Sequence, residues 1–172
     1  MDINVLCNSP TNTLKSDLIS ALYNGTGLSK IDKIVLVDSS GAERDGTTAL
    51  SYNVADSLTI SGIITATAEY TINRVRLYAG TKLYFESTLS SPVSVSANAS
   101  VNVTVTITYS QTGSLTNYTF NMDAIKTLFY NVLAGNASAS SLNITTIRIY
   151  VYNVDTGETP VSYTHLTLPT SD

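Results

Sequence analysis

The stretch from Ile72 to Ser110, INRVRLYAGTKLYFESTLSSPVSVSANASVNVTVTITYS, decides the fold class of this chain. It is rich in β-branched and aromatic residues, which favour strands. Ala79, Gly80 and Thr81 are predicted to form the tip of a hairpin. Residues 101–109 then alternate strictly between apolar and polar side chains. A one-residue slip of this strand would expose its whole apolar row, so we expect its register to be firm.

Strands are also predicted before this stretch. Between residues 58 and 68 the apolar residues fall mostly at even positions, and Gly62 in their middle predicts a bulge or a bend. From Val75 onward the apolar set moves to odd positions, so a turn or bulge is expected between residues 71 and 74. Residues 34–37 are consecutively apolar, which predicts a strand buried on both faces, and a Ser-Ser-Gly turn follows it.

Two amphipathic helices are predicted, over residues 11–24 and 121–134. Thr11 or Thr13 can cap the first helix, and Gly25 ends it. The sequence therefore indicates an α+β fold that is mainly antiparallel β, with a sandwich-like sheet and one or two short helices packed on it.

We divide the chain into three parts. Residues 1–110 form a helix plus β-sheet module, and residues 111–160 begin a second helix-strand unit. That unit resembles a truncated duplication, since IDKIVLVDSSGAE from Ile31 and ITTIRIYVYNVDTGE from Ile144 share an apolar core and a glycine turn. Two unrelated helix-strand pairs are the alternative. Residues 161–172 contain VSYTHLTLPT, which resembles a translated sequencing adapter of metagenomic gene predictions, so we expect a non-native tail and a longer natural protein.

The composition bounds the classes of function. Charged residues make up only 13% of the chain and the net charge is −4, without a basic cluster, so we expect no nucleic-acid partner. The first residues lack a positive region and a long apolar run, and no segment approaches the length of a membrane span, so neither a signal peptide nor a membrane partner is expected. Cys7 is the only cysteine, which excludes an intrachain disulfide, and we interpret it as a buried apolar residue or an intermolecular link.

Few residues could carry chemistry. The only histidine, His165, lies in the suspect tail, and no nucleophile or phosphate-binding motif occurs. Glu69 and Glu86 could in principle form a glycosidase-like pair, although soluble strand carboxylates are the preferred interpretation. Residues 38–46 offer oxygen ligands around two glycines but lack the EF-hand spacing, so a solvated turn is preferred over a calcium site. We therefore expect no catalytic residue, no metal, no cofactor and no enzymatic activity.

The order of segments resembles a known family. A helix, the segment from Asp45 to Leu50, the hairpin from Ile72 to Gly80 and the strand from Val101 to Tyr109 are similar to the N-terminal or attachment modules of phage tail-fibre and related virion structural proteins. The match covers about residues 14–110 and rests on apolar and turn positions. This chain has Arg74-Val75-Arg76 where the common phage version has glutamate, an apolar residue and glycine.

The resemblance implies a non-enzymatic virion structural protein, tail-fibre or baseplate-associated, that forms a homo-oligomer or binds other virion proteins. Candidate interface residues lie in or near the region 82–109, namely Tyr78, Tyr84, Phe85 and Tyr109. Two alternatives stay open: a filament or adhesin subunit of an extracellular surface, and a carbohydrate-binding β-sandwich module with a glycan receptor.

Overall fold

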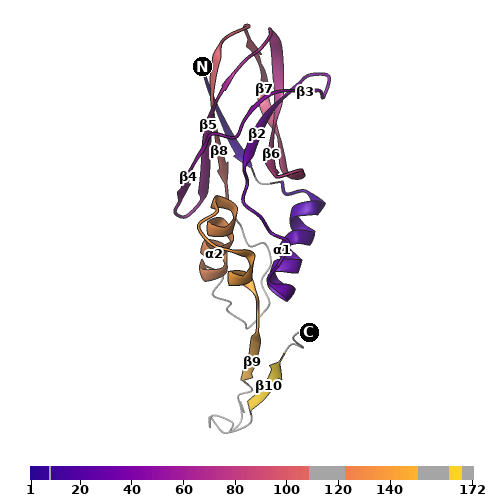
Figure 1. The fold of residues 1–172 in the computed structure, drawn as a ribbon, viewed down its shortest axis with the longest axis vertical. Coiled ribbons are helices and arrows are strands. Elements are labelled where there is room, and N and C mark those ends of the chain that lie inside the picture. The colour runs from indigo at the N-terminus through magenta and orange to yellow at the C-terminus, as the bar shows by residue number, and fades with distance from the viewer. Residues whose placement is uncertain (8, 109–122, 151–162, 168–172) are drawn as a thin grey trace.

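The computed structural model describes residues 1–7, 9–108, 123–150 and 163–167. The molecule is elongated: eight strands form a β-sandwich, two helices lie at one end of it, and a two-stranded hairpin extends beyond the helices (Figure 1). The elements in chain order are β1 (Asp2–Cys7), α1 (Asn12–Asn24), β2 (Lys33–Asp38), β3 (Glu43–Thr47), β4 (Leu50–Val54), β5 (Leu58–Thr65), β6 (Tyr70–Ala79), β7 (Lys82–Val95), β8 (Ser100–Ile107), α2 (Asp123–Ala134), the 3-10 helix η1 (Ala139–Leu142), β9 (Thr146–Tyr150) and β10 (Tyr163–Thr167).

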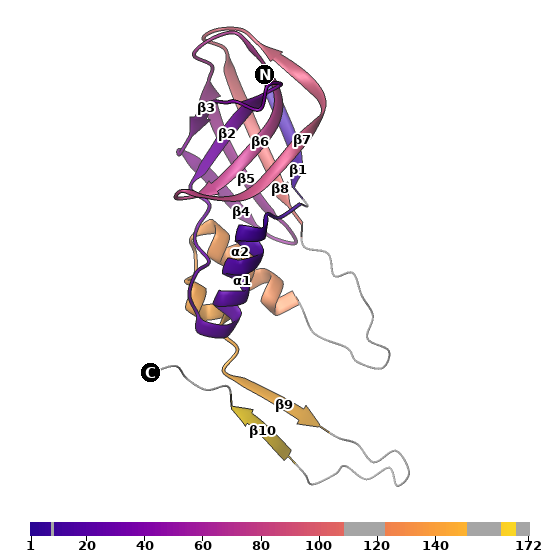
Figure 2. The same ribbon diagram turned by 90° about the vertical axis from the view of Figure 1, so that its right-hand side faces the viewer.

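The sandwich consists of two four-stranded sheets. Sheet A has the order β1-β8-β5-β4, and sheet B has the order β3-β2-β6-β7. All pairings within them are antiparallel except that of β1 with β8, which is parallel. The α+β fold, mainly antiparallel and sandwich-like with two short helices, is therefore confirmed, and Figure 2 shows the two sheets facing each other above the helices.

The core lies between the two sheets and is built from alternate residues of their strands. In β8, Val101, Val103, Val105 and Ile107 are buried while their neighbours point outward, as the alternation predicted. Burial of each such side chain contributes about 1.5–3 kcal/mol relative to exposure, and this fixes the register. The predicted double burial of residues 34–37 is also confirmed, because all of them are buried in β2.

Helix α1 forms where its capping residues predict it. The Thr11 hydroxyl accepts a hydrogen bond from the Leu14 amide at 3.3 Å, which satisfies one of the free amides of the first turn. At the other end Gly25 takes the left-handed conformation, with φ of 70°, and ends the helix. The backbone of Thr11 also binds the Tyr84 carbonyl, so the start of α1 is attached to sheet B.

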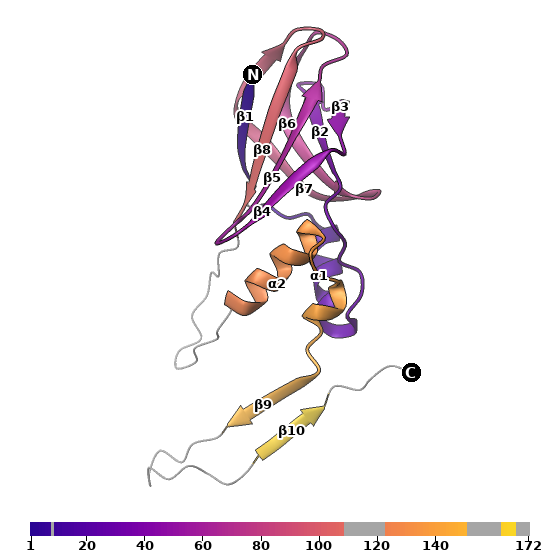
Figure 3. The same cartoon turned by 60° about the vertical axis from the view of Figure 1, so that its left-hand side comes forward.

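Helix α2 closes the same end of the sandwich. Its buried residues, which include Phe129, Tyr130 and Leu133, belong to the same hydrophobic core as the strands. The Leu133 carbonyl accepts a hydrogen bond from the Ile31 amide at 2.9 Å, which joins α2 to the segment before β2. Figure 3 shows α1 and α2 side by side below the sheets, with β9 and β10 beyond them.

Two local expectations have different outcomes. The bulge expected between residues 71 and 74 is confirmed. The register of β6 shifts near Asn73 both in its pairing with β2 and in its pairing with β7. The bulge or bend expected at Gly62 is wrong, because β5 pairs in continuous register with both β4 and β8. A Cβ on Gly62 would lie 2.7 Å from Thr47 Cγ2 and 2.9 Å from Leu50 Cδ2, so the glycine permits this close approach of the chain.

The division of the chain at residue 110, the duplication and the non-native tail stay predictions. The structure pairs β9 with β10 in a separate antiparallel ladder, with Ile147 opposite Leu166, which bears on none of them.

Candidate interaction surfaces

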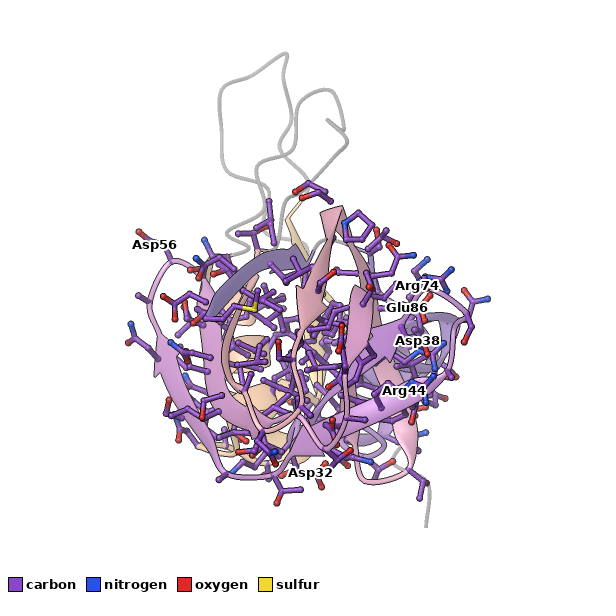
Figure 4. The ribbon with its side chains drawn as sticks, turned by 90° about the horizontal axis from the view of Figure 1, so that it is seen from above. Asp32, Asp38, Arg44, Asp56, Arg74 and Glu86 are labelled. Atoms are coloured by element: carbon purple, nitrogen blue, oxygen red, sulfur yellow. The ribbon has the colours of Figure 1, made fainter. Side chains whose placement is uncertain are left out.

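Charged side chains are distributed unequally between the two sheets. The strands of sheet A contain one charged residue, Asp2, whereas those of sheet B contain nine: Lys33, Asp38, Glu43, Arg44, Asp45, Arg74, Arg76, Lys82 and Glu86. Viewed down the sandwich, Arg74, Glu86, Asp38 and Arg44 lie together on one side, and Asp56, in the turn between β4 and β5, lies on the opposite side (Figure 4). The two outer faces of the molecule therefore differ in chemistry.

The outer face of sheet B, which we call the charged face, carries a connected set of ion pairs. Arg76 binds Glu86 at 2.6 Å and Glu43 at 2.9 Å, and Arg74 lies 3.5 Å from Glu86. The Tyr78 hydroxyl donates a hydrogen bond to Glu43. This bond and Arg76 lower the pKa of Glu43, while the bond from Arg76 to Glu86 raises the pKa of the guanidinium. These groups satisfy one another, which is typical of a solvated sheet face.

A second charged group closes the turn after β2. Asp38 accepts hydrogen bonds from the hydroxyl and amide of Ser40, from the Ala42 amide and from the Arg44 guanidinium. The Ser40 hydroxyl and, after it, Arg44 and the amides lower the pKa of Asp38 to about 2. The carboxylate therefore holds the turn of residues 39–42, whereas Asp38 itself ends β2 and residues 43–46 belong to β3, so the expected solvated turn covers only part of the range 38–46.

The outer face of sheet A is made almost wholly of hydroxyl and amide side chains. We call it the hydroxyl-rich face, and it consists of Asp2, Asn4, Leu6, Ser51, Asn53, Thr59, Ser61, Ile63, Thr65, Ser100, Asn102, Thr104 and Thr106. The strand register places these residues in straight rows across the sheet. One row runs Asn4, Thr104, Ser61 and Ser51, and the next runs Leu6, Thr106, Thr59 and Asn53.

Two large apolar side chains stand exposed on this face. Ile63 is 64% exposed and Leu6 is 59% exposed, although each belongs to a regular strand. A shallow hollow of about 520 Å³ lies beside Ile63, lined by Ala49, Leu50, Ser51, Ser61, Gly62, Ile63 and Asn102. The hydroxyl-rich face thus combines a protruding apolar residue with an adjacent concavity.

A second depression, of about 360 Å³, separates the edge strands β1 and β7. It is lined by residues 2–6 of β1 and by Thr88, Leu89, Ser90, Ser91 and Val93 of β7. Residues 89–92 of β7 bulge away from β6, because Thr88 pairs with Arg74 and Val93 with Ile72. Pro92 in this bulge has no amide hydrogen, so this part of the β7 edge is poorly suited to accept a further strand.

The predicted interface residues are not found together on one surface. Tyr84 is 0% and Phe85 is 3% exposed, so both rings belong to the core of this chain and present no surface in this conformation. For Tyr84 the cause is the packing of α1 against β7, whereas Phe85 pairs with the buried Leu77 of β6 and faces the core. Tyr78 is half-buried on the charged face, and Tyr109 lies outside the described residues.

Tyr84 instead joins the sheet to the first helix. Its hydroxyl donates a 2.8 Å hydrogen bond to Asp17 Oδ2 and accepts one from the Ser29 amide at 3.1 Å. Lys82 binds the same carboxylate at 2.8 Å. Burial, and after it the bond to Asp17, raises the pKa of Tyr84 to about 12. The hydroxyl also lies 3.5 Å from the Gly27 carbonyl, so it is held by α1 and by the segment that follows it.

The two carboxylates that could have formed a glycosidase-like pair lie far apart, and one of them is bound in ion pairs. Glu86 is bound by Arg76, which is its partner across the ladder, and Glu69 lies exposed seven residues before Arg76 in the chain. At about 3.3 Å per residue the separation is roughly 20 Å, beyond the reach of a glycosidase pair.

Cys7 is buried, which raises the pKa of its thiol, and its Sγ lies 2.9 Å from Ser87 Oγ. In the part of the chain that the structure describes, no three His, Cys, Asp or Glu side chains could hold a metal ion together.

The comparisons with known proteins add no family. Neither the family models, nor the curated proteins, nor the solved structures contain a significant match to this chain. Among the described helices, none is both long and apolar enough to cross a membrane.

Proposed function

We propose that this chain is a non-enzymatic structural protein of a virion, tail-fibre or baseplate-associated, which acts by assembling with copies of itself or with other virion proteins. The observation that carries this proposal is the hydroxyl-rich face of sheet A, with Ile63 and Leu6 exposed on it.

The argument starts from the cost of bringing two surfaces together. Charged side chains must lose water when they enter an interface, and this loss offsets much of the attraction they gain. The charged face of sheet B would bear that cost for Arg74, Glu43 and their partners. The hydroxyl-rich face would not, because Asp2 at its edge strand is its one charged residue.

The assignment to a virion rests on the resemblance of residues 14–110 to tail-fibre modules. An extracellular filament or adhesin subunit would use the same neutral surface, so the shape of the assembly distinguishes the two. Electron microscopy of the purified full chain tests this directly: closed particles of defined size favour the virion protein, and open filaments favour the surface subunit.

A carbohydrate-binding module is the second candidate, because rows of Ser, Thr and Asn can donate and accept hydrogen bonds to sugar hydroxyls. The hydroxyl-rich face contains no aromatic residue on which a sugar ring could stack. Self-assembly is therefore the function that this surface supports best.

The test of the proposal is the solution mass of the full chain, measured by light scattering after size exclusion over a series of concentrations. We expect a dimer or a larger closed oligomer. A monomer at every concentration overturns the proposal, and a glycan array then becomes the next experiment.

A further inference from the structure

We infer that the partner of the hydroxyl-rich face is the same face of a second copy, in a two-fold dimer with Ile63 at its contact. This inference rests on the proposed function and names the partner of that surface.

Charge is the first argument for a second copy. The chain carries a net charge of −4, so two copies repel each other unless they meet where charge is absent. The faces of the two sheets offer different choices: sheet B presents Arg74, Arg76 and Glu86, whereas sheet A presents Ser, Thr and Asn. Two hydroxyl-rich faces can approach with Asp2, on the edge strand, as the one charged residue of each face. Their hydroxyl groups can both donate and accept hydrogen bonds, so the surface is complementary to itself.

Shape is the second argument. Ile63 protrudes directly beside the hollow that Ser51, Ser61 and Asn102 help to line. In a two-fold dimer each contact occurs twice, so the Ile63 side chain of each copy can occupy the hollow of the other. A protruding residue and a concavity that are neighbours on one face suit this reciprocal arrangement.

Area is the third argument. Strands β5 and β8 each contain eight residues. Strand β1 contains six residues and β4 contains five. At about 3.3 Å per residue and about 4.8 Å per strand, the four-stranded face covers roughly 430 Å². Two such faces bury roughly 860 Å², which is below the roughly 1,200 Å² of a standard stable interface and suits a weak dimer that forms as concentration rises.

The first experiment compares two matched substitutions, Ile63→Lys and Ile19→Lys, by sedimentation velocity of the full chain. Ile19 lies on the outer side of α1 and is 66% exposed, close to the 64% of Ile63, so both variants exchange the same side chain at the same exposure. We expect Ile63→Lys to weaken dimerisation by at least about 30-fold, the loss typical of a central contact residue, and Ile19→Lys to leave it unchanged.

The second experiment does not depend on loss of binding. The variants Ile63→Cys and Ser51→Cys are mixed and oxidised, and the disulfide-linked heterodimer is measured on a non-reducing gel. Ile19→Cys mixed with Ser51→Cys is the control. The native Cys7 is buried and does not compete.

The outcomes separate this inference from the proposed function. Monomeric Ile63→Lys with dimeric Ile19→Lys, together with a crosslink at position 63 alone, supports the inference. A wild-type oligomer that survives Ile63→Lys and yields no crosslink overturns the inference and leaves assembly through another surface standing. A wild-type monomer at every concentration overturns both.

Discussion

The Tyr84 hydroxyl donates a hydrogen bond to Asp17 at 2.8 Å, and this contact joins the buried start of β7 to helix α1. Asp17 is itself mostly buried, with 13% of its side chain exposed, and is also bound by Lys82. The contact therefore couples the position of the helix to the core of the sandwich.

Replacement of Tyr84 by Phe removes this bond while it keeps the ring. We expect the free energy of unfolding to fall by about 2 kcal/mol, because a hydrogen bond to a charged partner is lost and Asp17 remains partly buried. Urea unfolding followed by circular dichroism measures the change. Tyr23→Phe, which removes a hydroxyl from a side chain of α1 that is 54% exposed, is the control and should cost less than about 0.5 kcal/mol. Equal losses in the two variants would contradict the assigned role of Tyr84.

The same residue predicts a response to alkali. The folded protein holds the pKa of Tyr84 at about 12, above its ordinary value of 10.0, so the folded state favours the neutral phenol. The stability that this group contributes is fully present below pH 10 and is lost as the pH rises toward 12. We expect the melting temperature of the wild type to fall across this window more steeply than that of Tyr84→Phe. Parallel curves for the two proteins would show that the Tyr84 phenol does not titrate in this way.

Asp38 predicts a response to acid. Its pKa lies at about 2 in the folded protein, below the ordinary 3.8, so its contribution is present above pH 4 and is lost as the pH falls toward 2. We expect thermal melts of the wild type to lose stability in this range, and Asp38→Asn to reduce the loss. Asp38→Asn should already be less stable at neutral pH, because Arg44 loses its charged partner. An unchanged acid response in the variant would assign it to other carboxylates.

The chain around Thr47, before β4, passes close to Gly62. A Cβ at this position would lie 2.7 Å from Thr47 Cγ2, so Gly62→Ala should cost about 1–3 kcal/mol through crowding. Thr65→Ala, at the exposed end of the same strand, is the control and should change stability by less than about 0.5 kcal/mol. A neutral or stabilising Gly62→Ala would show that residues 47–50 pack elsewhere.

The position of Cys7 in β1, next to Ser87 in β7, should allow a disulfide to be engineered between these strands. Cys7 Sγ and Ser87 Oγ are 2.9 Å apart, so Ser87→Cys should form an intrachain bond with Cys7 after a small adjustment. We expect the oxidised variant to exceed its own reduced form in stability by about 2–4 kcal/mol, with no crosslinked dimer on a gel. A disulfide found only between chains would place β1 in another copy.

Local patterns predicted most strands and both helices. The alternation in β8 was clear because one face of that strand is buried and the other is exposed, and the Thr11 and Gly25 signals gave the ends of α1. Strand β1 was not predicted, although Ile3, Val5 and Cys7 alternate in the same way. Its parallel pairing with β8 joins residues 100 positions apart, and such a contact leaves no local signal.

The hydroxyl-rich face could be recognised only from the order of the strands in the sheets. The alternation within residues 58–68 and 101–109 already predicted that Ser61 and Thr104 face away from the core. Only the strand order showed that β1, β8, β5 and β4 are neighbours, which gathers the uncharged residues on one face and nearly all charges of the sandwich strands on the other. The burial of Tyr84 could not be predicted from the sequence either, because helix α1, which packs on it, is distant in the chain.

The measurement that tests the central claim most directly is the mass of the full wild-type chain by light scattering at low and at high sodium chloride concentration. Association through the hydroxyl-rich face involves no ion pairs, so we predict an oligomer whose mass is unchanged or larger at high salt. A mass that falls to that of the monomer as salt is raised would place the contact on the charged face of sheet B. A monomer at both salt concentrations would contradict assembly altogether.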